Sequence, residues 1–241
     1  MKKILIIGGS GFLGSHIADI FTMKKYNVTI FDRVKSKWLK KKQKMIVSNL
    51  QNTRLLEHAI KNSDIVYHFA AMSDIADCMK NPLTSAKINI LSTIKILNLC
   101  IKHKIKRFIY ASTIYIHSAQ GGFYRISKQA SELYIEEYSK RFSLNYTILR
   151  FGTVYGDRSN KKNNLTKIID DALKNNRLRY TGGTSKAVRR YIHVNDAANA
   201  SYNILKKKFI NKNVLITGRK KIKITHVMKL LSKLLNIKSK P

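Results

Sequence analysis

The stretch Gly8-Gly9-Ser10-Gly11-Phe12-Leu13-Gly14 decides the fold of this 241-residue chain. It follows the apolar run Lys3–Ile7 and leads into Phe12–Lys25, where apolar residues recur at helical spacing. The order predicts a strand, a tight glycine turn and a helix. Glycines in such a turn let the backbone approach a ligand closely, and they leave the helix N-terminus open to a phosphate group.

The rest of the chain alternates between short β-rich runs and amphipathic helices. The β-rich runs are Asn27–Phe31, Met45–Val47, Asp64–Phe69, Arg107–Ala111 and Tyr146–Phe151. The expected helices are Thr53–Lys61, Ala86–His103 and Tyr124–Arg141. This alternation implies βαβ units with right-handed crossovers on both faces of a parallel sheet. We therefore predict an α/β fold with a Rossmann-like, doubly wound parallel sheet.

Composition excludes several classes of protein. With 44% hydrophobic and 25% charged residues, the chain resembles one large or two small globular domains. The two cysteines, Cys78 and Cys100, argue against a disulfide framework, and no Cys/His cluster has zinc-ligand spacing, so no metal is expected. The opening apolar run ends at Gly8, too early for a signal peptide or a membrane span. We expect a cytoplasmic protein.

Net charge is the unusual property, since 47 Lys+Arg against 13 Asp+Glu give +34. Such a field attracts polyanions. The basic residues are scattered, however, and no RNA- or DNA-binding motif accompanies them, so a specific nucleic-acid partner is not expected. Abundant Lys, Ile and Asn are also typical of an AT-rich coding sequence.

Asp32 ends the second β-rich run, where a carboxylate accepts hydrogen bonds from the ribose diol of an adenine dinucleotide. An acid there repels a 2′-phosphate and favours NAD over NADP, although Arg33 stands beside it. Asn49-Leu50, after the third run, would flank the adenine. The remaining predicted contacts to NAD in the glycine turn are Gly8, Gly11, Phe12, Leu13 and Gly14.

Tyr124 and Lys128 form a Y-x-x-x-K pair at the start of a predicted helix. This spacing places both side chains on one helical face. The Lys128 ammonium can then lower the pKa of the Tyr124 phenol and hold the nicotinamide ribose, so that a phenolate acts as base. Thr113 ends the preceding β-rich run, where its hydroxyl could bond a substrate hydroxyl. The competing interpretation is a surface tyrosine beside a solvated lysine.

In this order the motifs resemble the NAD-dependent epimerase/dehydratase family of extended short-chain dehydrogenase/reductases, which acts on nucleotide sugars. The resemblance covers essentially the whole chain, and further matching stretches are His68-Phe69-Ala70-Ala71, Asn89, Leu149–Gly156 and Val188–Ala197. It implies catalytic roles for Thr113, Tyr124 and Lys128. It also implies that Phe69, Ala70 and Ala71 pass beside the cofactor, that Arg189 grips the substrate diphosphate, and that Asn89 and His193 are structural.

Two departures from the family pattern bear on the reaction. Dehydratases of the family carry Asp-Glu directly after the catalytic threonine, whereas Ile114-Tyr115 follow Thr113 here, which disfavours dehydration. Thr153 replaces the asparagine that helps to fix the substrate phosphate, and we take it as a candidate substrate contact. The run between Thr113 and Tyr124 is short, so a reduced substrate lid is expected.

These features favour an NAD-dependent nucleotide-sugar epimerase that works through transient oxidation to a keto-sugar. One alternative is a nucleotide-sugar reductase or dehydrogenase with net cofactor turnover. The other is a non-catalytic, basic NAD-binding protein that contacts RNA or a membrane surface. Retention of all three catalytic positions favours an enzyme.

The chain is expected to have an NAD-binding domain over residues 1–150 and a substrate-binding region over residues 151–241. Residues 191–208 are candidates for packing back on the first domain. Relatives commonly pair the helices that correspond to Ala86–His103 and Tyr124–Arg141 across a two-fold axis, and both helices have apolar faces here. A homodimer is therefore expected.

Overall fold

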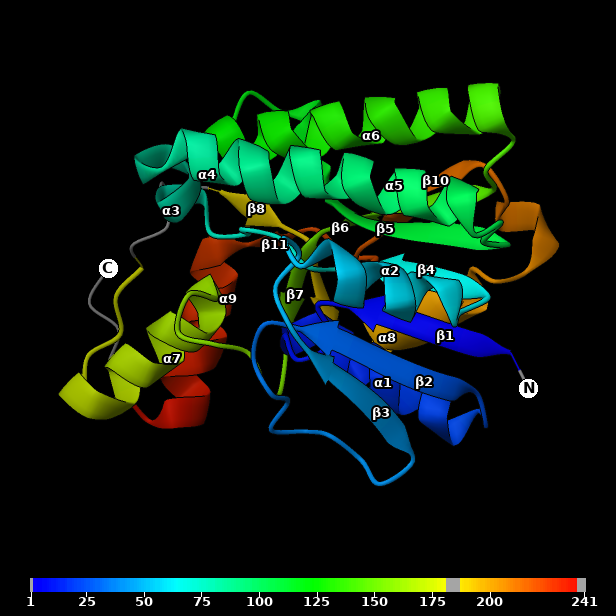
Figure 1. Cartoon of the computed structure of the whole chain (residues 1–241). Coiled ribbons are helices and arrows are strands. Elements are labelled where there is room, and N and C mark those ends of the chain that lie inside the picture. The colour runs from blue at the N-terminus through cyan, green and yellow to red at the C-terminus, as the bar shows by residue number, and fades with distance from the viewer. Residues whose placement is uncertain (1, 181–186, 238–241) are drawn as a thin grey trace. The chain divides into compact units, whose positions relative to one another are not determined.

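The computed structural model describes residues 2–180 and 187–237 (Figure 1). The chain forms two compact units, Met1–Phe151 with Ala198–Ile216, and Gly152–Ala197 with Thr217–Pro241. The domain boundaries expected from the sequence stay a prediction. In the described ranges, no helix combines the length and the apolar character needed to cross a membrane.

A seven-stranded sheet organises the first unit. Its strands are β1 (Lys3–Ile7), β2 (Asn27–Asp32), β3 (Gln43–Val47), β4 (Ile65–His68), β5 (Arg107–Thr113), β6 (Tyr146–Phe151) and β10 (Lys212–Ile216). The order is β10-β6-β5-β4-β1-β2-β3, and every neighbouring pair is parallel. The order reverses between β1 and β4, so the predicted Rossmann-like, doubly wound sheet is confirmed.

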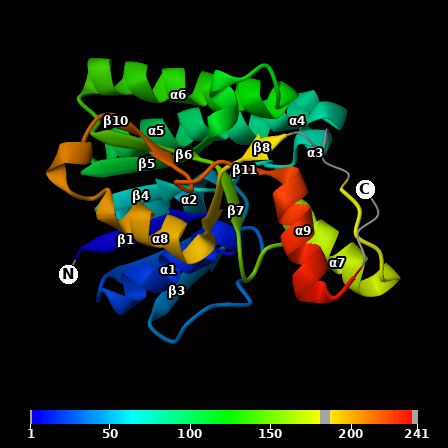
Figure 2. The same ribbon diagram turned by 180° about the vertical axis from the view of Figure 1, so that it is seen from behind.

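Helices cover both faces of this sheet (Figures 1 and 2). One face carries α2 (Thr53–Lys61), α5 (Ser92–Lys102) and α6 (Gly122–Phe142). The other carries α1 (Phe12–Met23) and the first-unit part of α8 (Val194–Asn203). Ile4 to Ile7 on β1 are at most 1% exposed, because a parallel strand covered on both sides is buried along its whole length.

The predicted helix Ala86–His103 is interrupted in the structure. It begins as α4 (Pro82–Ala86), preceded by α3 (Ile75–Lys80), passes through a π-helical turn at Lys87–Leu91, and continues as α5. Asn89 in this turn is 1% exposed, and its side chain exchanges hydrogen bonds with the backbone N–H and C=O of Met72 at 2.8 and 3.0 Å. The turn therefore lets a buried amide hold a neighbouring loop, as expected for Asn89.

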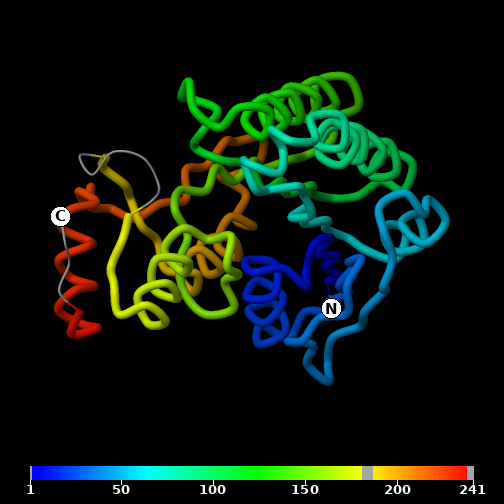
Figure 3. The backbone as a smooth tube through the Cα atoms, turned by 90° about the vertical axis from the view of Figure 1, so that its left-hand side faces the viewer, coloured from blue at the N-terminus to red at the C-terminus, as the bar shows by residue number. Residues whose placement is uncertain are grey.

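The second unit has a small core of its own. Helices α7 (Asn164–Asn175) and α9 (Ile224–Leu235) pack through Ile168, Ala172 and Leu231, and the yellow-green and red coils lie side by side in Figure 3. Two short pairs of strands accompany them, β7 (Thr153–Tyr155) with β9 (Tyr191–His193) and β8 (Val188–Arg189) with β11 (Ile222–Lys223). The sequence analysis did not identify α7.

Candidate active site

The glycine turn between β1 and α1 has no room for side chains at two positions. Gly8 has φ +89°, and a Cβ there would lie 2.4 Å from the backbone nitrogen of Ala70. A Cβ on Gly14 would lie 2.3 Å from the carbonyl oxygen of Gly8. Only glycine fits both places. Gly11 is the N-cap of α1 and no side chain caps this helix, so its N-terminus can receive a phosphate group.

The loop after β4 lies against this turn. The backbone N–H groups of Phe69 and Ala70 both donate to the carbonyl of Ile7, at 2.7 and 2.9 Å. This double hydrogen bond holds the backbone of Phe69 and Ala70 beside Gly8, and the expected contact of Phe69, Ala70 and Ala71 with the cofactor stays a prediction.

Asp32 is held at the other side of the glycine turn. Its Oδ2 accepts from the Ser10 N–H at 3.0 Å, and its Oδ1 accepts from the Val34 N–H at 3.3 Å. A carboxylate has about four acceptor sites, so lone pairs remain for a ribose diol. The arrangement of Gly8, Gly14 and Asp32 therefore fits an adenine dinucleotide.

Asn49 and Leu50 follow β3 in the same unit. Asn49 Oδ1 accepts from the N–H groups of Gln51 and Asn52, at 2.9 and 3.1 Å. Leu50 packs against the main core of the unit. The Asn49 oxygen is thus already used by the backbone, and a hydrogen bond to adenine would come from its NH₂ group.

Replacing Asp32 by alanine should weaken NAD binding by about 1–3 kcal/mol, because a charged hydrogen-bond acceptor is lost. Calorimetric titration with NAD and with NADP measures this effect. The neighbouring variant Arg33→Ala is the control and should retain the preference for NAD. If the parent chain preferred NADP, the assignment of Asp32 would be wrong.

The three predicted catalytic side chains come together where β5 ends and α6 begins. The Thr113 hydroxyl lies near enough to the Tyr124 phenol to lower its pKa, and Thr113 is 5% exposed. Lys128 is 2% exposed, its Nζ donates to the carbonyl of Ala111 at 2.8 Å, and the same atom lies 6.0 Å from the centre of the Tyr124 ring. A hydroxyl, a phenol and an ammonium thus share one small region.

Electrostatics in this region differ from the sequence-based expectation. Burial raises the pKa of the Tyr124 phenol, and the nearby Thr113 hydroxyl only partly opposes this shift. Burial also lowers the pKa of Lys128 to about 7, against the opposing charge of Glu132. The expectation that Lys128 lowers the pKa of Tyr124 is therefore wrong for this structure, because desolvation dominates and the ammonium is bonded to Ala111.

A buried ionic network that the sequence analysis missed supports the site. Glu132 is 4% exposed and accepts hydrogen bonds from the hydroxyl of Ser112 and from Arg150 Nη2, the latter at 2.6 Å. It thereby ties α6 to β5 and β6, one helical turn beyond Lys128. The available signal was the Lys128/Glu132 spacing, which places both residues on one face of the helix.

Two predicted substrate contacts belong to the second unit. Thr153 opens β7, and Arg189 ends β8 with its Nη1 donating to the carbonyl of Val188 at 3.2 Å. The Arg190 guanidinium instead holds the carbonyls of Gly218 and Arg219, at 3.3 and 2.7 Å. His193, expected to be structural, is half-buried on β9.

No group of at least three His, Cys, Asp or Glu side chains suited to a metal ion occurs within residues 2–180 and 187–237. The chemistry available in the first unit is therefore a dinucleotide cradle next to a phenol, a hydroxyl and a lysine.

Comparison with known proteins gives relatives of two reaction types. A putative UDP-glucose 4-epimerase of Methanocaldococcus jannaschii is 28% identical over 218 residues, which cover 82% of this chain and 72% of the relative. A dTDP-D-glucose 4,6-dehydratase of Dictyostelium discoideum is 29% identical over 244 residues, 86% of this chain. The match spans only 56% of that dehydratase.

Solved structures share the fold across nearly the whole chain. A UDP-glucose 4-epimerase of Thermotoga maritima, solved with UDP-glucose, has TM-score 0.88 and 25% identity, covering 99% of this chain and 84% of its own. A UDP-glucuronic acid 4-epimerase of Bacillus cereus, solved with UDP-glucuronic acid and NAD, has TM-score 0.90 and 24% identity. The match covers 98% of this chain and 84% of that epimerase. The profile of one family also matches residues 4–216. This chain therefore belongs to the NAD dependent epimerase/dehydratase family, and its cofactor is NAD.

Proposed function

We propose that this chain is an NAD-dependent nucleotide-sugar epimerase. Membership of the family supports an enzyme that acts on sugar nucleotides. The observation that carries the proposal further is that Thr113 and Tyr124 lie together beside the buried Lys128. A generic NAD-binding surface has no need of this arrangement.

In the proposed mechanism Tyr124 takes the proton of a sugar hydroxyl, and the Thr113 hydroxyl holds that oxygen in place. NAD, when bound, supplies the acceptor, and later the donor, of a hydride at the carbon bearing this oxygen. The pKa of the phenol is raised here, so Tyr124 is neutral near pH 7. A positive charge next to a phenol lowers its pKa, so we expect the phenolate to form only when NAD and the sugar nucleotide occupy the site. Lys128 then orients the ribose through its ammonium.

Epimerisation is favoured over dehydration by the residues after Thr113. Ile114 and Tyr115 begin a short 3-10 turn, Ile114–His117, at the place where dehydratases of the family carry an acid and a base. Ile114 and Tyr115 do not supply the two carboxyl groups that act as acid and base in those dehydratases. The groups expected for elimination of water are therefore missing here.

The two alternative functions differ in what separates them from an epimerase. A reductase or dehydrogenase would use the same three residues, and only the redox balance of the reaction separates it from an epimerase. A non-catalytic protein that binds through its +34 charge would have no use for Lys128, which is only 2% exposed. Burying an ammonium costs free energy, whereas a binding surface needs its charges exposed.

Arg189 should matter more than its neighbour for the sugar-nucleotide reaction. A guanidinium suits a diphosphate, and Arg190 already bonds the carbonyls of Gly218 and Arg219. We therefore expect Arg189→Ala to raise KM for the sugar nucleotide at least about tenfold, and Arg190→Ala to lower mainly thermal stability. Steady-state kinetics and thermal melts check both. If Arg189→Ala, Arg190→Ala and the neutralisation of Lys207 and Lys208 all changed KM equally, a function based on charge alone would be favoured.

The nucleotide can be identified by incubating the NAD-loaded protein with UDP-, GDP-, dTDP- and CDP-sugars and analysing the products by chromatography. The proposal expects one nucleotide series to be converted to an isomer of unchanged mass. Loss of water from the product would instead assign the chain to the dehydratases of its family.

We also propose that the chain forms a homodimer through α5 and α6. The two helices contact each other, with the Tyr138 hydroxyl donating to Asn98 Oδ1 at 2.7 Å. Ile126, Leu133 and Tyr134 on α6 are nevertheless 47%, 63% and 45% exposed, an apolar surface that a second copy could cover.

Light scattering at physiological salt should give twice the chain mass at micromolar concentration, because salt screens the +34 charge beyond about 8 Å. Leu133→Lys should shift the protein toward the monomer, while Lys140→Ala on the same helix should not. A monomeric parent chain would contradict the proposal.

A further inference from the structure

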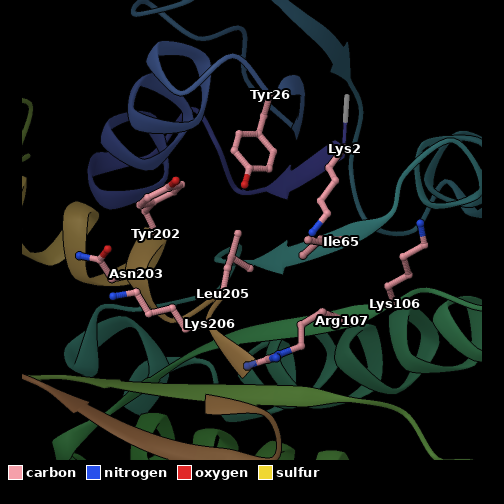
Figure 4. Close-up of a pocket in the computed structure, with 9 residues that line it drawn as sticks. All are labelled: Lys2, Tyr26, Ile65, Lys106, Arg107, Tyr202, Asn203, Leu205 and Lys206. Atoms are coloured by element: carbon pink, nitrogen blue, oxygen red, sulfur yellow. The ribbon is translucent and has the colours of Figure 1, made fainter. Parts of the chain in front are cut away.

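A cavity of about 360 Å³ lies in the first unit at the amino-terminal ends of the strands. Lys2 precedes β1, Tyr26 precedes β2, and Lys106 and Arg107 stand where β5 begins. Tyr202 and Lys206, from α8 and the turn after it, line the same space (Figure 4). The glycine turn and Tyr124 follow the opposite, carboxyl ends of β1 and β5, so this cavity is separate from the candidate active site.

The lining of the cavity is positively charged and contains no carboxylate. Lys106 is neutralised by Asp64, whose Oδ1 lies 2.8 Å from its Nζ. Lys2, Arg107 and Lys206 have no such partner among residues 2–180 and 187–237. Three basic residues from three separate segments of the chain therefore line the cavity without a paired carboxylate.

Arg107 is a buried cation within this lining. It is 6% exposed, and its guanidinium donates to Thr147 Oγ1 and to the carbonyl of Ile204, at 3.1 and 3.2 Å. Both acceptors are neutral, and burial lowers the pKa of the guanidinium. A buried charge without a counter-charge is unfavourable, so an anion in the cavity would stabilise the folded chain.

Two phenols complete the lining. The rings of Tyr26 and Tyr202 lie edge to face with centroids 6.3 Å apart, and Figure 4 shows both beside the cavity. Phe21 fixes both rings, with centroid distances of 5.2 and 5.6 Å. A phenol hydroxyl can donate its proton to a ligand oxygen.

We propose that this cavity binds a small phosphate-bearing molecule, either free diphosphate or a phosphate ester. Phosphate oxygens are suited to a guanidinium, ammonium groups and a phenol donor together. The volume lies at the lower end of the range for small-molecule sites, about 300–1,000 Å³, and residues of five segments line it, so its size suits a compact ligand better than a nucleic-acid strand. The proposal does not depend on the proposed enzymatic activity.

The test is a calorimetric titration of the NAD-loaded full chain with inorganic diphosphate at physiological salt. We expect saturable binding of one diphosphate, and a dissociation constant about tenfold higher in Lys206→Ala, because a charged hydrogen bond is lost. Lys207→Ala removes the same charge from an exposed neighbour outside the cavity, so it is the matched control and should change binding less than about twofold. Tyr202→Phe should also weaken binding, since it removes only a hydroxyl.

Several outcomes would overturn the proposal. Equal weakening by Lys206→Ala and Lys207→Ala would mean that diffuse charge attracts the anion. Weakening by Arg189→Ala with no effect of Lys206→Ala would place the diphosphate at the sugar-nucleotide site of the proposed enzyme. Absence of saturable binding up to millimolar diphosphate would also refute it. A parallel titration with phosphatidylglycerol vesicles separates a soluble ligand from a lipid headgroup, and binding to vesicles alone would exclude the soluble ligand.

Discussion

Replacing Tyr124 by phenylalanine should lower turnover of the sugar nucleotide at least about 100-fold, while NAD binding and folding persist. The change keeps the ring and removes only the hydroxyl, which lies near Thr113. Steady-state kinetics, with calorimetric titration of NAD on the same preparation, separate the loss of the base from a loss of cofactor. The pH dependence of turnover in the parent chain gives the pKa of the base in the loaded site. Its difference from the ordinary pKa of a phenol measures the electrostatics there.

The exposed Tyr134 offers a matched control on the same helix. Tyr134→Phe removes an identical hydroxyl about three turns away and should leave turnover within about twofold of the parent. Near-normal turnover in Tyr124→Phe would remove this residue from the mechanism.

Replacing Lys128 by methionine should reduce both turnover and NAD affinity, yet make the folded chain more stable below pH 7. The pKa of Lys128 is about 7 in the folded chain, against about 10.4 when unfolded. Between these values the unfolded chain binds more protons, so the unfolding free energy of the parent rises with pH through this window. Below pH 7 the full penalty of the buried ammonium applies, and methionine lacks it.

Urea denaturation at pH 6 and pH 10 measures the difference in unfolding free energy between Lys128→Met and the parent. The contributions of all other titrating groups largely cancel in this difference. We expect Lys128→Met to be more stable than the parent by about 1–3 kcal/mol at pH 6, and by much less at pH 10. A variant less stable than the parent at pH 6 would show that the ammonium is stabilised where it lies.

The fold followed from the sequence because its signals are local and repeated. The apolar run of β1 has no polar alternation, as required of a strand buried on both faces, and Gly8 and Gly14 occupy places where a Cβ would collide with backbone. The position of Thr113, Tyr124 and Lys128 at one end of the sheet follows from parallel topology, since β5 and α6 meet there.

Other features depend on three-dimensional contacts and left no local pattern. The π-helical turn at Lys87–Leu91 exists because Asn89 bonds Met72 from a distant loop. The pKa of Tyr124 depends on desolvation, which the spacing to Lys128 does not reveal. Arg107 looked like the first residue of an apolar strand, and only the structure shows it as a buried cation at the edge of a cavity.

The most direct test of an epimerase is the redox balance of its reaction. The purified chain, with NAD present in less than the amount of sugar nucleotide, should be incubated with the sugar nucleotide that the product analysis identifies and followed by NMR together with NADH absorbance. The account predicts an equilibrium mixture of two epimeric sugar nucleotides with no net formation of NADH. Formation of NADH in proportion to product, or a product that has lost water, would contradict it.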